Sequence, residues 1–274
     1  MMDKKDNRGK AMKLLELIGC PFVDFSAINR NEDALTKLYL EHYHKGKKEG
    51  YTPIIMNRDM ELQEWYWHYF DVPMRPENYP LLVQTIIKKA NSKPFSYWYH
   101  EIYEKYFLDL QEGDDEEYER NLIEEILRRP SDNQYASLTE SLGIVPLKIK
   151  QYIPSSEWTY EKQCWIDNSD VLALIPTTKS WEILAWLPIG GFNWCPTPEY
   201  QVAFAKHMNE AYRAEVMSVC TVQIEFYLEN PLVEKEQVIA AAQDLTVMDD
   251  DWYQDMEICP AQVYGKQWLP LWWD

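Results

Sequence analysis

One short segment carries the residue types best suited to chemistry. Gly190 and Gly191 precede Asn193, Cys195 and Pro196. Glycine adopts backbone angles closed to other residues, asparagine can bond neighbouring backbone, and proline suits a helix start. The segment therefore predicts a rigid loop that presents Asn193 and Cys195 beside the amino terminus of the next helix.

Cys195 allows two interpretations. In the first, the dipole of that helix lowers the pKa of the thiol and makes Cys195 a nucleophile. In the second, which we favour, the loop is a tight turn and the cysteine packs as a small hydrophobic side chain. The only histidine in this half, His207, falls about two to three turns into the helix, where it is poorly placed to act as a base for the thiol.

The carboxy-terminal residues Trp272, Trp273 and Asp274 form the second part of this candidate site. Two indoles at a frayed chain end would reduce solubility, so we expect this end to be pinned as a last strand. Side chains alternate along a strand, so one indole would cover the core and the other would line a groove. The two carboxylates of Asp274 would complete a site with the loop only if the fold brings them together.

Other clusters of polar residues fit structural roles better. His42 and His44 lie two residues apart, a spacing that does not share a helix face, so they do not predict a metal site. The acidic run Asp249–Asp251 lacks the central glycine of a calcium loop and is interpreted as a solvated turn or as a helix N-cap at Asp249 or Asp250. The motifs of nucleotide-binding, serine-hydrolase and zinc-protease sites are absent. We therefore expect no metal and no cofactor, and we favour a protein without catalysis.

The elements that must position these residues begin with a β-α-β unit. Residues 20–25 predict a strand, Asn31 caps a helix from Glu32 to about Lys48, and residues 52–56 predict a second strand. This order favours parallel strands. Further helices are expected over residues 59–70, 95–110 and 118–127.

The pattern changes after Gly143. Period-two and short apolar runs predict strands over residues 147–152, 171–176, 181–187, 214–219, 222–228 and 268–274. Amphipathic spacing predicts helices over residues 198–212 and 234–245. The fold class is therefore α/β: a mixed β-sheet with flanking helices, preceded by the β-α-β unit and a helical insertion.

A shift in composition places a boundary at the same point. Residues 1–150 hold 21 basic and 26 acidic side chains, whereas the other 6 and 19 give residues 151–274 a net charge of −13. Nine of the 12 tryptophans lie at or after Trp158. We divide the chain into 1–142, an α-rich region with the β-α-β unit, and 143–274, an acidic, tryptophan-rich α/β domain.

The carboxy-terminal half resembles a known family. Gly190-Gly191-Phe192-Asn193-Trp194-Cys195-Pro196 is similar to the glycine-glycine-aromatic-asparagine-x-cysteine-proline motif of the bacterial domain-of-unknown-function family 4253. Tyr212-Arg213-Ala214-Glu215 stands where that family has tyrosine-glycine-alanine-glutamate, and Trp272-Trp273-Asp274 matches its terminus. The resemblance covers about residues 165–274 and departs from the pattern at Trp194, Arg213 and Pro270-Leu271. It supports the α/β fold and implies no activity, because none is established for the family.

Composition narrows the classes of function. The net charge of −18 excludes a nucleic-acid binder that works through charge, and no apolar run approaches the roughly 20 residues of a membrane span. No signal-peptide run follows the amino terminus, and the five cysteines form no CxxC pair, so we expect a cytoplasmic protein. An acidic, aromatic surface suits a non-catalytic protein that captures a basic protein partner, for example in an immunity-like role. The alternative is an enzyme or small-ligand-binding protein with a site around Asn193 and Cys195.

Overall fold

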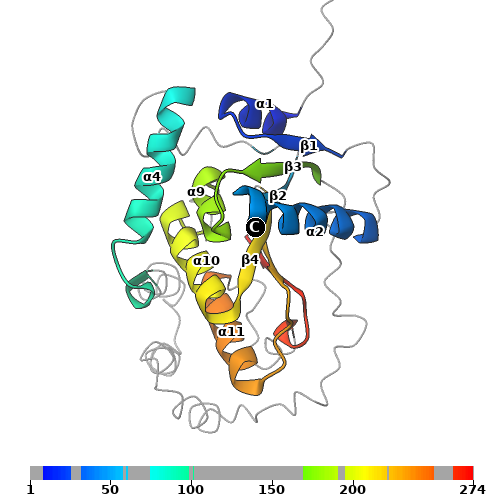
Figure 1. The fold of residues 1–274 in the computed structure, drawn as a ribbon. Coiled ribbons are helices and arrows are strands. Elements are labelled where there is room, and N and C mark those ends of the chain that lie inside the picture. The colour runs from blue at the N-terminus through cyan, green and yellow to red at the C-terminus, as the bar shows by residue number, and fades with distance from the viewer. Residues whose placement is uncertain are drawn as a thin grey trace, which may run out of the picture.

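The computed structural model describes residues 9–25, 32–57, 60, 75–98, 101, 169–190, 195–220, 222–249 and 262–273. Within these ranges six strands form one open sheet in the order β1-β3-β2-β4-β5-β6 (Figure 1). The strands are β1 (Phe22–Asp24), β2 (Thr52–Asn57), β3 (Ser169–Ile175), β4 (Ala214–Cys220), β5 (Gln223–Leu228) and β6 (Trp268–Trp272). Only β2 and β4 pair in parallel, so the sheet is mixed and the predicted α/β class is confirmed.

The predicted β-α-β unit lies at the start of the sheet. β1 and β2 flank the helix α2 (Glu32–Glu49), which stops at Gly50, where φ is +86°. Glycine adopts this angle without steric cost and therefore ends helices well. Both strands pair antiparallel with β3, so they run parallel to one another, with β3 between them.

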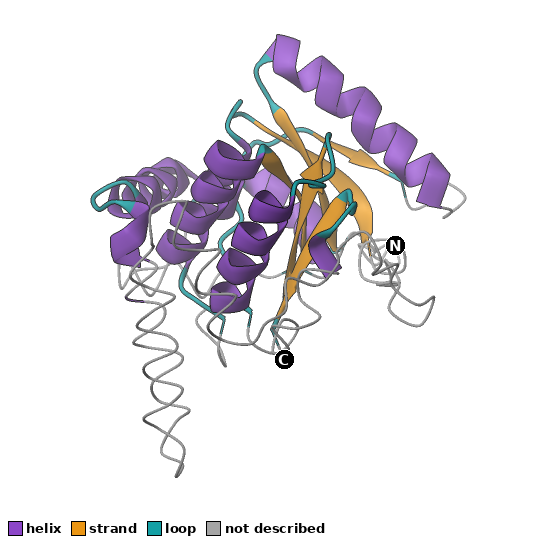
Figure 2. Ribbon diagram, turned by 90° about the horizontal axis from the view of Figure 1, so that it is seen from below, coloured by secondary structure: helices purple, strands orange, loops and turns teal. Residues whose placement is uncertain are grey.

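Helices cover both faces of the sheet (Figure 2). One face carries α1 (Lys10–Leu17), the single turn η1 (Pro76–Asn78), α4 (Tyr79–Ala90), α9 (Ile183–Trp186), α10 (Pro198–Tyr212) and α11 (Lys235–Met248). The other face carries α2, which buries a smaller apolar cluster against the sheet. None of the described helices is both long and apolar enough to cross a membrane.

The helix predicted over residues 198–212 is α10. Pro198 occupies its first turn, where a missing N–H costs nothing and the fixed φ suits a helix. The helix ends at Arg213, whose φ of +59° is left-handed. A residue with a Cβ pays a steric cost in that conformation, which fits the glycine that the resembled family has at this position.

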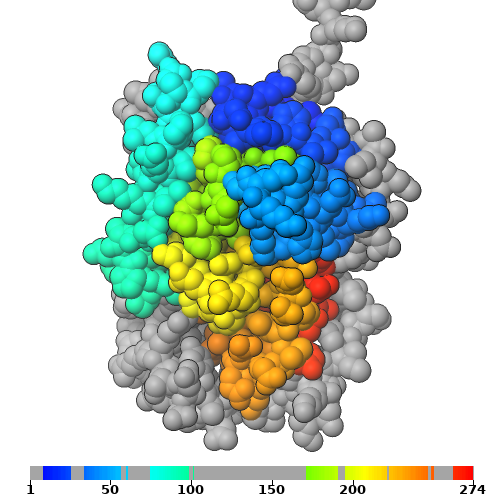
Figure 3. Space-filling view, in the orientation of Figure 1, coloured from blue at the N-terminus to red at the C-terminus, as the bar shows by residue number. Residues whose placement is uncertain are grey.

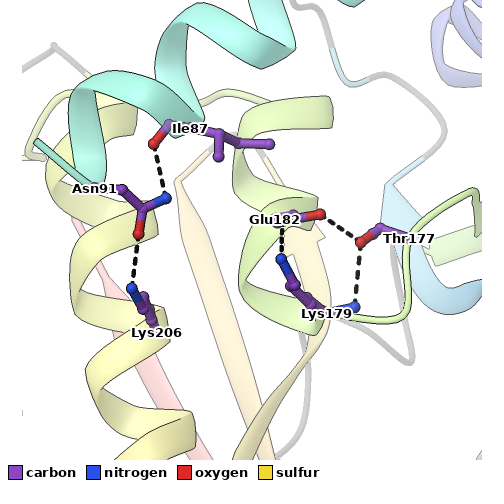
Figure 4. Close-up of polar contacts among 6 residues, drawn as sticks. All are labelled: Ile87, Asn91, Thr177, Lys179, Glu182 and Lys206. Atoms are coloured by element: carbon purple, nitrogen blue, oxygen red, sulfur yellow. Dashed lines mark hydrogen bonds and ion pairs between the residues drawn. The ribbon is translucent and has the colours of Figure 1, made fainter.

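One predicted strand is wrong. Residues 181–187 form the turn η5 (Ser180–Glu182) and the helix α9 instead of a strand. Thr177 Oγ1 donates to Glu182 Oε2 at 2.6 Å and accepts the Lys179 backbone N–H at 3.2 Å (Figure 4). These bonds wind the chain into a helical turn directly after β3. The apolar run did not alternate, so its pattern suited a buried helix as well as a strand.

Several predictions lie outside the described residues. They are the Asn31 cap, the helices over 59–70 and 118–127, most of the helix over 95–110, and the strand over 147–152. The domain boundary at 142/143 also lies there and stays a prediction. β1 and β2 precede that boundary and β3 follows it, so the two predicted regions contribute to one sheet.

Candidate functional site

The predicted site residues are only partly described. Gly191, Asn193 and Asp274 lie outside the described residues, whereas Cys195, Trp272 and Trp273 lie within them. The described part of the site therefore consists of the two ends of the glycine loop and the end of β6. Both parts are held in place by hydrogen bonds and close contacts to backbone atoms.

The ends of the loop are clamped onto the first turn of α10. Gly190 has a φ of +97°, and a Cβ added there would lie 2.1 Å from the carbonyl oxygen of Pro196. Gln201, which is fully buried, donates its Nε2 to the carbonyl oxygens of Ile189 at 3.1 Å and Pro196 at 2.7 Å. The same Nε2 lies 3.4 Å from Cys195 Sγ. Only glycine fits this close crossing of the two loop ends.

Cys195 is a buried, neutral thiol. Its side chain is 0% exposed. Burial, reinforced by the charge of Asp249, raises the pKa of the Cys195 thiol well above its usual range, and the bond from Gln201 offsets only part of that rise. A nucleophilic cysteine requires a lowered pKa, whereas the surroundings of Cys195 raise it. The prediction of a nucleophile is therefore wrong, and the packing interpretation agrees with the structure.

We accordingly expect Cys195 to resist alkylation in the folded protein. Iodoacetamide at about pH 8 should leave Cys195 unmodified in buffer and modify it in denaturant, because the reagent needs an accessible thiolate. Cys20 serves as an internal control: it should also stay unmodified in buffer, because burial raises its pKa to about 11. Peptide mass spectrometry resolves the individual cysteines. Rapid native alkylation of Cys195 alone would restore the nucleophile hypothesis.

The carboxy-terminal strand is pinned as predicted. The Trp273 indole is 2% exposed, and its Nε1 donates to the carbonyl oxygen of Met248 at 2.8 Å. The backbone N–H of Trp273 donates to the Val222 carbonyl oxygen at 2.9 Å. Trp272, at the end of β6, is half-buried, so the two indoles differ in exposure as expected from strand alternation.

Asp249 joins the end of β6 to the loop. Its side chain is 1% exposed at the carboxy terminus of α11, and its Oδ2 accepts the backbone N–H of Trp272 at 2.6 Å. Its charge also raises the pKa of the Cys195 thiol, so Asp249 acts on both the end of β6 and the end of the glycine loop. The interpretation of Asp249 as part of a solvated turn is therefore wrong. The carboxylate is buried because it satisfies a strand N–H that has no partner on β5.

Two further polar clusters, which the sequence did not reveal, lie inside the fold. His207 Nε2 and the Tyr212 hydroxyl both contact Asp244 Oδ2 at 2.6 Å, which links α10 to α11. In the sheet, Gln223 Nε2 donates to Glu225 at 3.2 Å, and the Ser218 hydroxyl also bonds this fully buried carboxylate. Partners of the first cluster lie 37 residues apart, so no local spacing pattern could have found it. Both clusters satisfy buried charges within the core.

A different grouping lies where α2 packs against β4, β5 and β6. In Figure 3, the blue atoms of α2 lie against the orange and red atoms of the carboxy-terminal part of the chain. We call it the acidic–aromatic corner and define it as Tyr39, Tyr43, Glu215, Tyr227, Glu229 and Trp268. The Tyr43 and Tyr227 ring centroids are 6.0 Å apart and nearly perpendicular, and those of Tyr227 and Trp268 are 4.9 Å apart. Tyr39 stacks on Tyr43 at 5.9 Å. The aromatic rings thus form one continuous group across α2 and the sheet.

Two carboxylates, those of Glu215 and Glu229, flank these rings. Glu215 Oε1 accepts a bond from the Tyr43 hydroxyl at 3.4 Å, and Glu229 is exposed just after β5. Burial, together with the charges of Glu215 and Glu229, raises the pKa of the Tyr43 phenol. Neither carboxylate forms an ion pair with any described residue. Within the described part of the chain, the corner therefore combines aromatic rings with two carboxylates that form no direct ion pair.

The chain is an open, mixed-sheet α/β protein. The described ends of the glycine loop, which carries the strongest sequence motif, pack against the first turn of α10. Residues 171–274 match the family model described as Domain of unknown function (DUF4253), which confirms the resemblance over the carboxy-terminal part of the chain. No curated protein and no solved structure matches the chain. The matched residues supply Glu215, Tyr227, Glu229 and Trp268 to the corner, whereas α2 lies outside the match.

Proposed function

We propose that this protein is a non-catalytic interaction protein that binds a basic protein partner at the acidic–aromatic corner. An immunity-like role, in which the captured partner is neutralised, is one concrete form of this function. The observation that carries the proposal is the pair of carboxylates, Glu215 and Glu229, which lie beside aromatic rings without a cationic partner among the described residues.

The physical basis of such binding has a long-range and a short-range part. A net charge of −18 attracts a basic partner from a distance and speeds its association. At contact, the half-buried Trp268 offers an aromatic surface, and lysine or arginine can pair with Glu215 and Glu229. The proposal also places the protein in the cytoplasm, where the free thiols of Cys20, Cys195 and Cys220 would persist.

The β6 edge of the described sheet, beside the corner, favours side-chain capture over addition of a strand. In β6, the backbone N–H groups of Leu269 and Leu271 face β5, so the nitrogens of Trp268, Pro270 and Trp272 face outward. Proline has no N–H to donate, and the N–H of Trp272 is bonded to Asp249. Pairing with a partner strand needs free outward N–H groups. The proposed partner therefore contacts side chains of the corner.

A labelled octa-arginine peptide tests the proposal as a probe for basic segments. We expect the double variant Glu215→Gln/Glu229→Gln to bind it about fivefold to tenfold more weakly than the wild type, because each exposed charge pair contributes up to ~1 kcal/mol. Fluorescence anisotropy at two salt concentrations measures the affinity. Rising salt should weaken wild-type binding.

The control variant is Glu41→Gln/Glu77→Gln, which changes the net charge equally at exposed positions outside the corner. We expect it to retain most of the wild-type affinity. Equal losses in the two double variants, or no binding of the peptide by the wild type, would contradict a binding site at the corner.

A further inference from the structure

Lys47 already places a cation in the acidic–aromatic corner. Its Nζ lies 4.0 Å from the centroid of the Tyr43 ring and also donates to the Tyr43 hydroxyl. An ammonium group over an aromatic face is attracted by the negative face of the π-system. The corner therefore binds a side-chain cation in the free protein, supplied by α2 itself.

This placement differs from that of a neighbouring lysine. Lys45 pairs with Glu49, one turn further along α2, at 3.8 Å. Lys47 forms no ion pair with a described residue, although Glu215 and Glu229 lie around the same tyrosine. Lys47 thus lies against Tyr43, whose hydroxyl also bonds Glu215, and among the described residues it pairs directly with neither Glu215 nor Glu229.

The hydroxyl of Tyr39 is a second, independent sign of an incomplete site. Tyr39 is 0% exposed, and its hydroxyl is buried without a hydrogen-bond partner. The ring stacks on Tyr43, and burial, together with the charge of Glu215, raises the pKa of the Tyr39 phenol. An unpaired buried hydroxyl is costly, so Tyr39 leaves a polar atom of the corner unsatisfied.

We propose that the face of Tyr43 is a cation subsite, and that an arginine or lysine side chain of the basic partner displaces Lys47 from it. This inference rests on the proposed function and names the chemistry of its first contact. The incoming cation takes the ring face and pairs with Glu215. A guanidinium suits the subsite best, because it stacks on a ring and donates several hydrogen bonds at once. Lys47 then acts as an internal competitor that lowers the affinity for weakly basic partners.

The octa-arginine peptide also tests this subsite. We expect Lys47→Ala to bind the peptide about threefold to tenfold more tightly than Lys48→Ala, a range that corresponds to the usual strength of a cation–π contact. Both variants remove one positive charge from neighbouring positions of α2, and both side chains are exposed. Their difference therefore isolates the contact with Tyr43. Thermal melting of each variant confirms that α2 stays folded.

The remaining outcomes separate the two proposals. Equal affinities of Lys47→Ala and Lys48→Ala, or weaker binding by Lys47→Ala, would overturn the cation subsite. If the wild type still bound the peptide and Glu215→Gln/Glu229→Gln still lost affinity, the proposed function would stand without it. Failure of the wild type and of every variant to bind the peptide would overturn both proposals.

Discussion

Replacement of Gly190 by alanine is expected to lower the free energy of unfolding by about 3 kcal/mol or more. The added Cβ would lie 2.1 Å from the Pro196 carbonyl oxygen, 2.4 Å from Gln201 Nε2 and 3.0 Å from Cys195 Sγ. The first of these atoms is backbone, and the second is held by hydrogen bonds to two carbonyl oxygens. None can move aside without opening the crossing of the loop ends.

Gly265→Ala is the matched control for this substitution. Gly265 also has a positive φ, +69°, but nothing lies within 4 Å of a Cβ placed there. We expect a loss of only about 1 kcal/mol, from the left-handed backbone alone. Denaturant unfolding measures both values. Equal losses for the two variants would show that the loop ends do not cross as closely as the structure has them.

Trp273→Ala is expected to cost about 3–5 kcal/mol, the usual range for removing a buried tryptophan. The side chain belongs to the main core cluster and bonds the end of α11 through Met248. Trp272 is only half-buried, so Trp272→Ala should cost less than half as much, in proportion to the smaller apolar area that it removes from water.

Trp273→Phe separates packing from hydrogen bonding at this position. Phenylalanine refills most of the space but leaves the Met248 carbonyl oxygen without its indole donor. We expect an intermediate loss, near the ~1–3 kcal/mol of an unsatisfied buried acceptor plus a small cavity. Thermal or denaturant unfolding reports it. A loss for Trp272→Ala as large as for Trp273→Ala would contradict the assignment of which indole anchors the chain end.

Local signals in the sequence predicted most of the described elements. The bounds of α10 follow from Pro198 and from the helical spacing of its apolar residues, and the structure reproduces them. The error over residues 181–187 arose where periodicity was missing, because a short apolar run suits a buried strand or a buried helix. There the side-chain bonds of Thr177 and Lys179 selected a helical turn. A non-local bond in Figure 4, from Lys206 to Asn91, ties α10 to the end of α4 across 115 residues, and Asn91 also bonds Ile87 within that helix end.

The candidate sites depended on contacts that sequence spacing does not encode. The sequence indicated that Cys195 and the terminal tryptophans mattered, yet it could not place Asp249 between them. The acidic–aromatic corner was missed because Tyr43 and Glu215 are separated by 172 residues and meet only through the sheet. The excess of acidic and aromatic residues after position 150 was the one signal of this surface in the sequence. It did not indicate which residues form the surface.

Hydrogen–deuterium exchange of the full chain with and without octa-arginine tests the central claim most directly, because it locates the bound peptide on the surface. Binding at the acidic–aromatic corner predicts slower exchange in the last turns of α2, in residues 229–234 after β5 and at the start of β6. Exchange around Cys195 and α10 should not change, and Glu215→Gln/Glu229→Gln should lose the protection. Protection centred on the Gly190–Cys195 loop, with none at the corner, would contradict the account.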